Sequence, residues 1–361
     1  MKTRNFWRSK KVFVTGHTGF KGSWLCLWLN YAGASVTGYA LDPPTTPSLF
    51  AQCRTDELVD SRFGDVRDPE SLTEAISQAR PEIIFHLAAQ SLVGESYCDP
   101  RVNYEVNVMG TVNLFEAVRR TGSARAVINV TSDKCYENRE WHWGYREDDP
   151  LGGNDPYSSS KACSELITCA YRNSFFNPRD YALHGVGAAS ARAGNVIGGG
   201  DWAKNRLIPD CMRAFLHNEA IMIRNPGAVR PWQHVLEPLG GYMTLAEKLY
   251  ENGPAYAEGW NFGPGEDDMR TVEWVVGQVC AGWGRGASYE VKCDTGFHEA
   301  RYLKLDSSKA RARLGWRPKW GLGKAIDQTL QWARGYEENE DPREICFRQI
   351  NDYESDFSGE K

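Results

Sequence analysis

The sequence has no CxxC pair and no cluster of cysteine with histidine, although it contains 10 cysteines. A zinc site of the usual ligand spacing is therefore excluded, and we expect no metal. A chain of 361 residues can also form its core without disulfides. The basic segment 1–16 leads into a strand and a glycine-rich loop rather than an apolar signal region, and the most apolar stretch, 24–29, is too short to cross a bilayer. These absences favour the reducing cytoplasm.

A strong excess of either charge is also missing. Lysine and arginine total 42 against 47 aspartate and glutamate residues, a net charge of −5. Such a surface offers no basic field to nucleic acid or to an anionic membrane, so neither is an expected partner. The 41% hydrophobic and 25% charged content is typical of a globular chain and argues against disorder. A phosphorylated ligand must therefore be bound by a local site.

What the sequence does contain is a regular alternation of short apolar runs and longer amphipathic ones. Strands are expected at 12–14, 36–41, 82–89, 126–131 and 186–191, and helices at 21–31, from 68, at 103–120 and at 157–172. This alternation predicts an α/β fold with a Rossmann-like, doubly wound parallel sheet. After residue 194 the pattern loosens into segments rich in glycine, proline and tryptophan. We therefore expect a first domain at 1–194, which also takes segments near 230–264, and a smaller, interleaved domain mainly at 195–361.

A glycine-rich loop follows the first expected strand, with the sequence Thr15-Gly16-His17-Thr18-Gly19-Phe20-Lys21-Gly22. Glycines spaced in this way between a strand and a helix permit a tight turn, close approach of the backbone to a pyrophosphate, and close helix–strand packing. The free N–H groups at the helix N-terminus attract the phosphates. The first domain is thus predicted to bind a dinucleotide through Gly16, Thr18, Gly19, Phe20 and Gly22.

The residue after the second strand indicates which dinucleotide binds. An acid there holds ribose hydroxyls, whereas an arginine holds a 2′-phosphate. Asp42 is the nearby acid and no arginine follows until Arg54, which favours NAD, although the adjacent Pro43-Pro44 bend also allows Asp42 to be a turn residue. In Gly64-Asp65-Val66, Asp65 is expected either to meet the adenine amino group or to be an ordinary strand-end turn.

Tyr157 and Lys161 form a YxxxK pair at the start of an expected helix. Their i,i+4 spacing places both side chains on one face. A lysine ammonium lowers the pKa of a neighbouring phenol, as does a positive nicotinamide ring, so that tyrosinate accepts a hydroxyl proton near neutral pH. Chance produces this spacing in many helices, but in combination with the glycine loop it predicts a catalytic site.

These motifs resemble, in their order, those of the extended short-chain dehydrogenase/reductase family. The matching strings are the glycine loop, Gly64-Asp65-Val66, His86-Leu87-Ala88-Ala89, Asn107-Val108-Met109-Gly110-Thr111 and Tyr157-x-x-x-Lys161. The resemblance implies that Leu87, Ala88 and Ala89 lie beside the NAD ribose. It also implies that Tyr157 is the base, that Lys161 is its partner and a ribose ligand, and that the chain forms a homo-oligomer, a dimer or tetramer.

The segment Thr131-Ser132-Asp133-Lys134-Cys135-Tyr136 is similar to the catalytic segment of the nucleotide-sugar 4,6-dehydratases. The resemblance implies that Ser132 completes the triad and that Asp133 protonates the departing C6 hydroxyl. Related enzymes that act on dTDP-glucose carry a glutamate, the base at C5, where this chain has Lys134. Three roles stay open for Lys134: stabilising the enolate as a cation, acting as the base with a lowered pKa, or only pairing with Asp133.

Longer strings narrow the resemblance to the dehydratases that act on CDP-glucose; they are 16–25, 131–136, 190–202, 223–238 and 260–264. The implied reaction oxidises C4, eliminates water across C5–C6 and returns the hydride to C6, in a step towards the 3,6-dideoxyhexoses of bacterial O-antigen. The enzymatic alternatives are a nucleotide-sugar 4-epimerase and a 4,6-dehydratase of another nucleotide sugar. The non-enzymatic alternative is a degenerate NAD-binding sensor.

The diphosphate of a nucleotide sugar requires local cations on this charge-balanced surface. The family places the segments that contain Arg192, Arg206, Arg230 and Arg301 around the substrate. The resemblance implies that Arg230 and Asn195 contact the diphosphate. Tyr302 follows Arg301 in another segment of the same kind, and both are expected to contact substrate.

Overall fold

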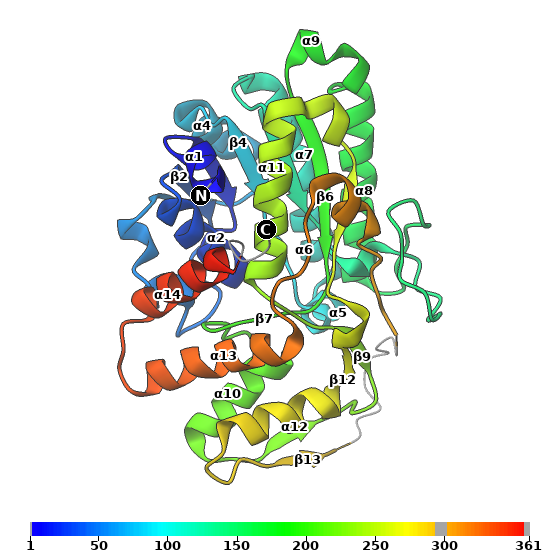
Figure 1. Ribbon diagram of the computed structural model, residues 1–361. Helices are drawn as coiled ribbons and strands as arrows, with labels where there is room; N and C mark the ends of the chain where they lie inside the picture. Colours follow the sequence, from blue (N-terminus) through cyan, green and yellow to red (C-terminus); the bar gives the residue numbers. More distant parts are fainter. Residues whose placement is uncertain (1, 293–301, 357–361) are drawn as a thin grey trace.

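The computed structural model describes residues 2–292 and 302–356. Seven strands form one parallel sheet in the order β11-β6-β5-β4-β1-β2-β3. Their bounds are β1 (Lys11–Thr15), β2 (Ser35–Ala40), β3 (Asp60–Phe63), β4 (Ile83–His86), β5 (Ala126–Val130), β6 (Gly187–Ala193) and β11 (Gly259–Phe262). The predicted α/β class and the doubly wound parallel sheet are confirmed (Figure 1).

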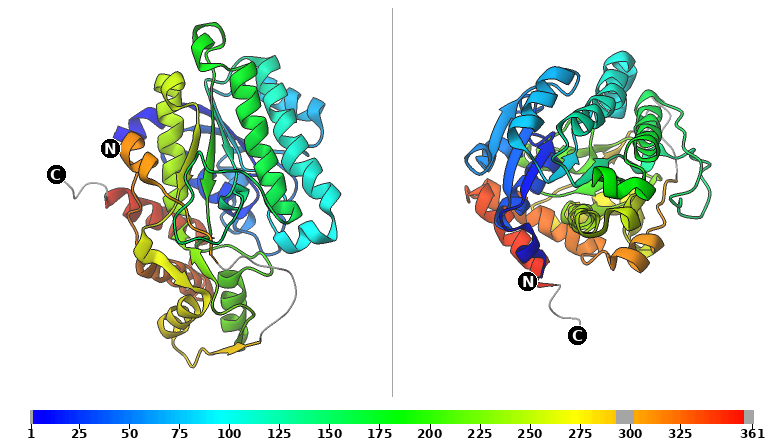
Figure 2. Two further views of the ribbon diagram at one scale, coloured as in Figure 1. Left: turned by 90° about the vertical axis from the view of Figure 1, so that its right-hand side faces the viewer. Right: turned by 90° about the horizontal axis from the view of Figure 1, so that it is seen from above.

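Two layers of helices cover the two faces of this sheet (Figure 2). Because side chains alternate along a strand, Val12 and Val14 face one layer and Phe13 faces the other. The first layer contains α2 (Phe20–Tyr31) and α11 (Leu236–Tyr256), and the second contains α4 (Pro69–Ala79), α7 (Gly110–Thr121) and α8 (Pro156–Ser174).

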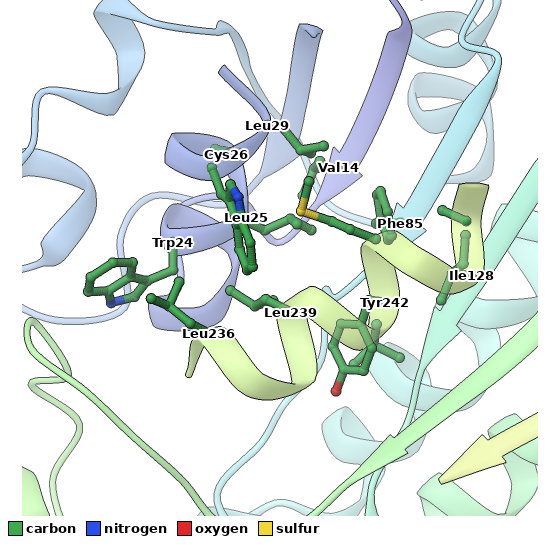
Figure 3. Packing of buried hydrophobic residues seen from close by; sticks show 14 of the residues in the cluster. Val14, Trp24, Leu25, Cys26, Leu29, Phe85, Ile128, Leu236, Leu239 and Tyr242 are labelled. Carbon is green, nitrogen blue, oxygen red and sulfur yellow. The ribbon is translucent and has the colours of Figure 1, made fainter. Parts of the chain in front are cut away.

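The first layer holds the larger apolar core. Figure 3 shows Trp24 and Leu25 of α2 near Leu236 and Leu239 of α11, and all four side chains are fully buried. Each such side chain contributes about 1.5–3 kcal/mol when it is removed from water. The C-terminal helix α14 (Pro342–Ser355) lies against α2, where Trp28 Nε1 donates to a carboxylate oxygen of α14 at 2.9 Å.

A second lobe has its own apolar cluster, built by α10 (Leu207–His217), α12 (Val272–Trp283) and α13 (Leu322–Glu337) (Figure 1). Short strands complete it in three pairs: β7 (Val196–Ile197) with β10 (Gln233–His234), β8 (Ile221–Ile223) with β13 (Tyr289–Val291), and β9 (Val229–Pro231) with β12 (Met269–Thr271). After β10 the chain returns to the seven-stranded sheet, where α11 contacts β5 and β6 and β11 pairs with β6. The domain limits at 194 and 195 stay a prediction.

Several expected elements differ in their bounds. The strand predicted at 82–89 ends at His86, because the Leu87 and Ala88 N–H groups both bond to the Thr15 hydroxyl, at 3.1 Å each. The helix predicted at 103–120 is α6 (Pro100–Tyr104), a π-helical turn (Glu105–Met109) and α7.

The remaining helical elements are short, and they are α1 (Lys2–Trp7), α3 (Leu49–Gln52), α5 (Val93–Cys98), α9 (Tyr181–His184), a π-helical turn (Ala310–Leu314) and the 3₁₀ turns Thr55–Glu57, Asp133–Cys135, Pro178–Asp180 and Glu266–Asp268. Among the helices of residues 2–292 and 302–356, none combines the length and apolar character needed to cross a membrane.

Candidate active site

The glycine loop leaves an open cradle at the carboxyl end of β1. Gly16 has a φ of +75°, and a Cβ there would lie 2.7 Å from the Ala88 nitrogen. A Cβ on Gly22 would lie 2.0 Å from the Gly16 oxygen, so both positions require glycine. Helix α2 begins after Gly19 with no side chain capping its N-terminus, which leaves its first N–H groups available to an anion. The cradle therefore fits the pyrophosphate of a dinucleotide.

The other predicted cofactor residues surround this loop. The Thr18 hydroxyl donates to the Leu41 oxygen at 2.9 Å and thereby ties the loop to the end of β2, where Asp42 is exposed. Phe20 is half-buried against the first-layer core. Leu87 and Ala88 form the backbone wall opposite Gly16, and Ala89 follows them, partly exposed.

At the end of β3, the Asp65 carboxylate accepts three bonds from its neighbour Arg67: from the backbone N–H at 2.9 Å, from Nε at 2.9 Å and from a terminal guanidinium nitrogen at 2.6 Å. Val66 is buried against Gly110. The predicted contacts of Asp42, Asp65 and Val66 with NAD stay predictions.

The three triad residues meet where β5 ends and α8 begins. Ser132 follows β5, and Asp155 caps α8 by accepting from the Ser158 N–H at 2.9 Å. Tyr157 and Lys161 are both buried in the first turns of this helix, and Lys161 Nζ donates to the Val130 oxygen at 3.3 Å.

The electrostatics of the triad differ from the sequence-based expectation. Burial raises the pKa of Tyr157 to about 12, and the hydrogen bond with Ser132 opposes this rise. The net shift is therefore upward and not downward as expected, because removal of the phenolate from water is the largest effect. Burial lowers the pKa of Lys161 to about 8, while the charge of Glu165 acts in the opposite direction.

Asp133 is the buried acid beside the triad. Its Oδ1 accepts from the Ser132 hydroxyl at 3.0 Å, whereas its Oδ2 has no hydrogen-bond partner among the residues described. A Cβ on Gly194 would lie 2.7 Å from this Oδ2, so the glycine lets the chain after β6 approach the acid. Burial raises the pKa of Asp133, against the charges of Lys134 and Arg230. The site thus holds a carboxyl group suited to proton donation.

Lys134 is half-buried, and it forms no ion pair with Asp133 within 4.0 Å. One of its three predicted roles, simple pairing with this acid, is therefore not seen. The roles as enolate-stabilising cation and as base stay predictions.

Arginine side chains approach this site from the second lobe. Arg230 on β9 is buried and its charge lowers the pKa of Asp133, although burial of the carboxyl dominates. Arg206, at the start of α10, pairs with Asp201 at 3.2 Å and donates to the Ser91 hydroxyl at 3.1 Å. Its positive charge also opposes the burial that raises the pKa of Tyr157.

The other predicted substrate residues lie around this lobe. The backbone oxygen of Asn195, between β6 and β7, accepts from the Gln233 N–H at 3.2 Å. The backbone oxygen of Tyr302 accepts from Asn138 Nδ2 at 2.9 Å. Arg301 lies outside the described residues. Contacts of Arg206, Arg230, Asn195, Arg301 and Tyr302 with substrate stay predictions.

Two charged residues near the site, Arg192 and Lys21, have surroundings that were not identified from the sequence. Arg192, in a segment that the family resemblance placed around the substrate, is buried in an ion pair with Glu165 at 2.8 Å. Lys21, between two glycines of the loop, was missed. Burial lowers its pKa to about 8, and the charges of Arg206, Asp133 and Lys161 act on it as well. Its position at the N-terminus of α2, facing the predicted site, was the available signal.

Comparisons with known proteins agree with this geometry. Residues 13–329 match the family described as GDP-mannose 4,6 dehydratase. A CDP-glucose 4,6-dehydratase of Salmonella typhimurium is 56% identical over 355 residues, covering 98% of this chain and 99% of that protein.

Solved structures are similar over almost the whole chain. The dTDP-glucose 4,6-dehydratase of Bacillus anthracis, crystallised in complex with NAD, has a TM-score of 0.76 at 23% identity and covers 94% of this chain and 100% of its own. DesIV, a dTDP-glucose 4,6-dehydratase from Streptomyces venezuelae with NAD bound, has a TM-score of 0.75 at 25% identity, over 92% and 99%. By the family match and the close relative, the chain belongs to the GDP-mannose 4,6 dehydratase family.

Proposed function

We propose that this chain is an NAD-dependent lyase that removes water from CDP-glucose and yields CDP-4-keto-6-deoxyglucose. The observation that carries the proposal is Asp133, a buried carboxyl group with a raised pKa and an unpaired Oδ2, hydrogen-bonded to the same Ser132 that contacts Tyr157. A site for C4 oxidation alone needs the triad but needs no such acid. The 56% identity to a CDP-glucose 4,6-dehydratase supports the nucleotide.

The residues present fit NAD. Gly16 and Gly22 form the cradle for its pyrophosphate, and the uncapped N-terminus of α2 supplies N–H donors to the phosphates. Asp42 is proposed to hold the ribose hydroxyls, and Lys161 the nicotinamide ribose. When bound, NAD supplies a hydride acceptor and later a hydride donor, together with a positive charge near Tyr157 that lowers the pKa of its phenol.

Tyr157 and Ser132 act on the C4 hydroxyl of the sugar. Ser132 donates a hydrogen bond to the reacting oxygen, and the phenolate of Tyr157 accepts its proton as the C4 ketone forms. The ammonium of Lys161 lies on the same face of α8 and favours the phenolate. Tyr157 must overcome a pKa raised by burial, so its partners Ser132 and Arg206 contribute to catalysis by lowering that pKa.

Asp133 acts on the C6 hydroxyl. The C4 ketone acidifies the proton at C5, so removal of that proton gives an enolate whose electrons expel the C6 oxygen. Asp133 donates its proton to this oxygen and water leaves. Its burial keeps the carboxyl protonated to a higher pH than that of an exposed aspartate. Removal of the C5 proton precedes this loss of water: Lys134 either accepts that proton itself or, as a cation, stabilises the enolate while another base accepts it.

Arg230 and Asn195 are proposed to hold the diphosphate, with Arg206 and Tyr302 along the same wall. A guanidinium binds phosphate oxygens through two parallel hydrogen bonds. Because the chain has a net charge of −5, the diphosphate requires such a local cation. In the cell, the product is proposed to lead towards the 3,6-dideoxyhexoses of O-antigen. The nine cysteines in the described residues are free thiols, which supports a cytoplasmic location, and a homo-oligomer is proposed by family resemblance.

Incubation of the purified chain with NAD and a panel of CDP-, dTDP-, UDP- and GDP-linked hexoses tests the proposal. Mass spectrometry should show loss of one water from CDP-glucose, without a net gain of reduced cofactor. Loss of water from dTDP-glucose or GDP-mannose alone would overturn the assignment to CDP. An isomer of unchanged mass would indicate a 4-epimerase, and absence of any reaction would support an NAD-binding sensor.

A further inference from the structure

A buried carboxylate that the proposed chemistry does not use joins α8 to two strands beneath the triad. Glu165 lies one turn after Lys161 and is 3% exposed. Its Oε2 accepts from the Ser190 hydroxyl at 2.6 Å and from an Arg192 guanidinium nitrogen at 2.8 Å. Its Oε1 accepts from the Thr131 hydroxyl. Both oxygens are therefore bound by residues at the carboxyl ends of β5 and β6.

Two successive turns of α8 are thereby bonded to the end of β5. Lys161 Nζ donates to the Val130 oxygen at 3.3 Å, and one turn later Glu165 accepts from Thr131. Ser132 is the next residue along the chain. The two bonds therefore set the distance between the segment directly after β5, which contains Ser132, and the helix that carries Tyr157.

Arg192 extends this connection towards the second lobe. Its guanidinium lies 5.0 Å from the centre of the Tyr136 ring, and a Cβ on Gly259 would lie 2.7 Å from one of its nitrogens, so it is enclosed between β11 and this ring. It donates to the Tyr136 hydroxyl at 2.6 Å and to the backbone oxygen of Glu147 at 2.9 Å.

From Tyr136 the hydrogen bonds continue to a predicted substrate segment. The Tyr136 hydroxyl donates to Asn261 Oδ1 at 2.7 Å, and Asn261 Nδ2 donates to the backbone oxygen of Asp306 at 3.1 Å. Asp306 belongs to the segment 302–306, which contains Tyr302. An unbroken series of contacts therefore links Glu165 on α8 to Asp306, 141 residues later in the sequence (306 minus 165).

We propose that the Glu165–Arg192 ion pair is a positioning element that aligns Ser132 with Tyr157 and couples this triad to segment 302–306. The inference rests on the proposed function, since the coupled groups are the proposed base and substrate contacts. Neither residue touches substrate in this arrangement; both act through Thr131 and Tyr136.

The same carboxylate also acts on the charge of Lys161. The ionisable groups that face Glu165 are Lys161 on its own helix, Arg192 on β6 and, from the turn after β5, Cys135 and Tyr136. A carboxylate favours the neighbouring ammonium, so removal of its charge lets Lys161 lose its proton at lower pH. The alkaline limb of the kcat profile is therefore expected to move to lower pH in Glu165→Gln.

Two isosteric variants test the coupling while they keep the ion pair. Thr131→Val removes the bond from β5 to Glu165, and we expect kcat to fall about 3- to 10-fold, the effect of one lost hydrogen bond, with KM for CDP-glucose little changed. Tyr136→Phe breaks the link to Asn261, and we expect KM to rise by about the same factor with a smaller effect on kcat. Glu165→Gln adds the pH measurement.

Glu340→Gln is the matched control, because Glu340, between α13 and α14, pairs with Arg348 at 3.0 Å and both side chains are exposed, so kcat, KM and the pH profile should stay unchanged. The proposal is overturned if Thr131→Val and Tyr136→Phe retain wild-type kcat and KM, or if their losses match the unfolded fraction measured by circular dichroism. It is also overturned if a folded Glu165→Gln keeps the wild-type pH profile. If Glu165→Gln does not fold, the two isosteric variants decide.

An inactive wild type on CDP-glucose rejects the proposed function instead of this inference. The same variants are then compared on whichever nucleotide sugar reacts. If none reacts, they are compared by the pH dependence of the chemical modification of Lys161.

Discussion

The Ser132 hydroxyl donates to Oδ1 of Asp133 at 3.0 Å. One hydrogen bond therefore joins the proposed acid, Asp133, to the serine that assists the proposed base, Tyr157. A hydroxyl has one proton to donate, so Ser132 cannot donate to the phenolate of Tyr157, and thereby lower its pKa, while it is bonded to Asp133. This bond also favours the carboxylate form of Asp133. In the proposed reaction, a substrate oxygen accepts the Ser132 hydrogen bond in place of Asp133, which should raise the pKa of Asp133 further. Sugar binding would then favour the protonated acid that the elimination requires.

Replacing this acid should separate oxidation from elimination. Asp133→Asn keeps the shape of the side chain but has no acidic proton, so dehydration should slow by about 10²- to 10⁴-fold. Oxidation at C4 does not need this proton and should continue. The near-ultraviolet absorbance of reduced nicotinamide, followed in a single turnover, should therefore rise and persist. Dehydration at the wild-type rate would show that the C6 oxygen receives its proton from another group.

Two substitutions of Lys134 should distinguish between its two remaining roles. If this residue stabilises the enolate through its charge, Lys134→Arg should keep activity within about tenfold, whereas Lys134→Gln should lose about 10²-fold. If it is the base, both should lose activity, because a guanidinium does not release its proton. Solvent deuterium at C5 of the product, measured by mass spectrometry, reports whether proton removal still occurs. Full activity of Lys134→Gln would exclude both roles.

Two glycine substitutions should have opposite effects. In Gly22→Ala the new Cβ would lie 2.0 Å from the Gly16 oxygen, so the loop must open, at a cost of about 1–3 kcal/mol in the free energy of unfolding, and NAD binding should weaken. Gly277 lies inside α12, and beyond its own helical turn no atom of the described residues lies within 4 Å of such a Cβ, so Gly277→Ala should stabilise by about 0.5–1 kcal/mol. Urea unfolding and NAD titration measure both effects. A Gly22→Ala protein with unchanged NAD affinity would contradict the proposed cradle.

The stability of the fold should depend on pH through Glu237. This buried carboxyl group on α11 accepts from the Trp320 N–H at 2.7 Å and from the Tyr353 hydroxyl at 2.8 Å. Burial raises its pKa from 4.5 to about 7, against these bonds. The folded state therefore holds a proton that the unfolded state releases, and the stability that Glu237 contributes is highest below pH 4.5 and falls as pH rises through 7.

The size of this effect is at most about 3–4 kcal/mol, because the pKa rises from 4.5 to about 7 and each tenfold change in a proton-binding constant corresponds to about 1.4 kcal/mol. Glu237→Gln should remove most of this slope from urea unfolding curves recorded between pH 4.5 and 7. The nearby Lys319, whose pKa burial lowers to about 8, titrates above that window and should leave it unaffected. An identical slope in Glu237→Gln would assign the pH dependence to other groups.

The sequence by itself determined the fold class, the glycine loop and the Tyr157–Lys161 spacing. Each depends on local features: alternating apolar patterns, the lack of a Cβ at Gly16 and Gly22, and a spacing that puts Tyr157 and Lys161 on one helical face. The resemblance of Thr131–Tyr136 to a catalytic segment likewise pointed to Asp133, which the structure places, buried, beside Tyr157.

Tertiary structure decided what those residues experience. The phenol of Tyr157 has a raised pKa rather than a lowered one because its burial depends on elements that fold over it. Arg192 pairs with Glu165 because β6 brings it beside α8, and Lys21 joins the site because α2 points its N-terminus there. Burial and the distance between charges arise from residues far apart in the chain, so no local pattern in the sequence records them.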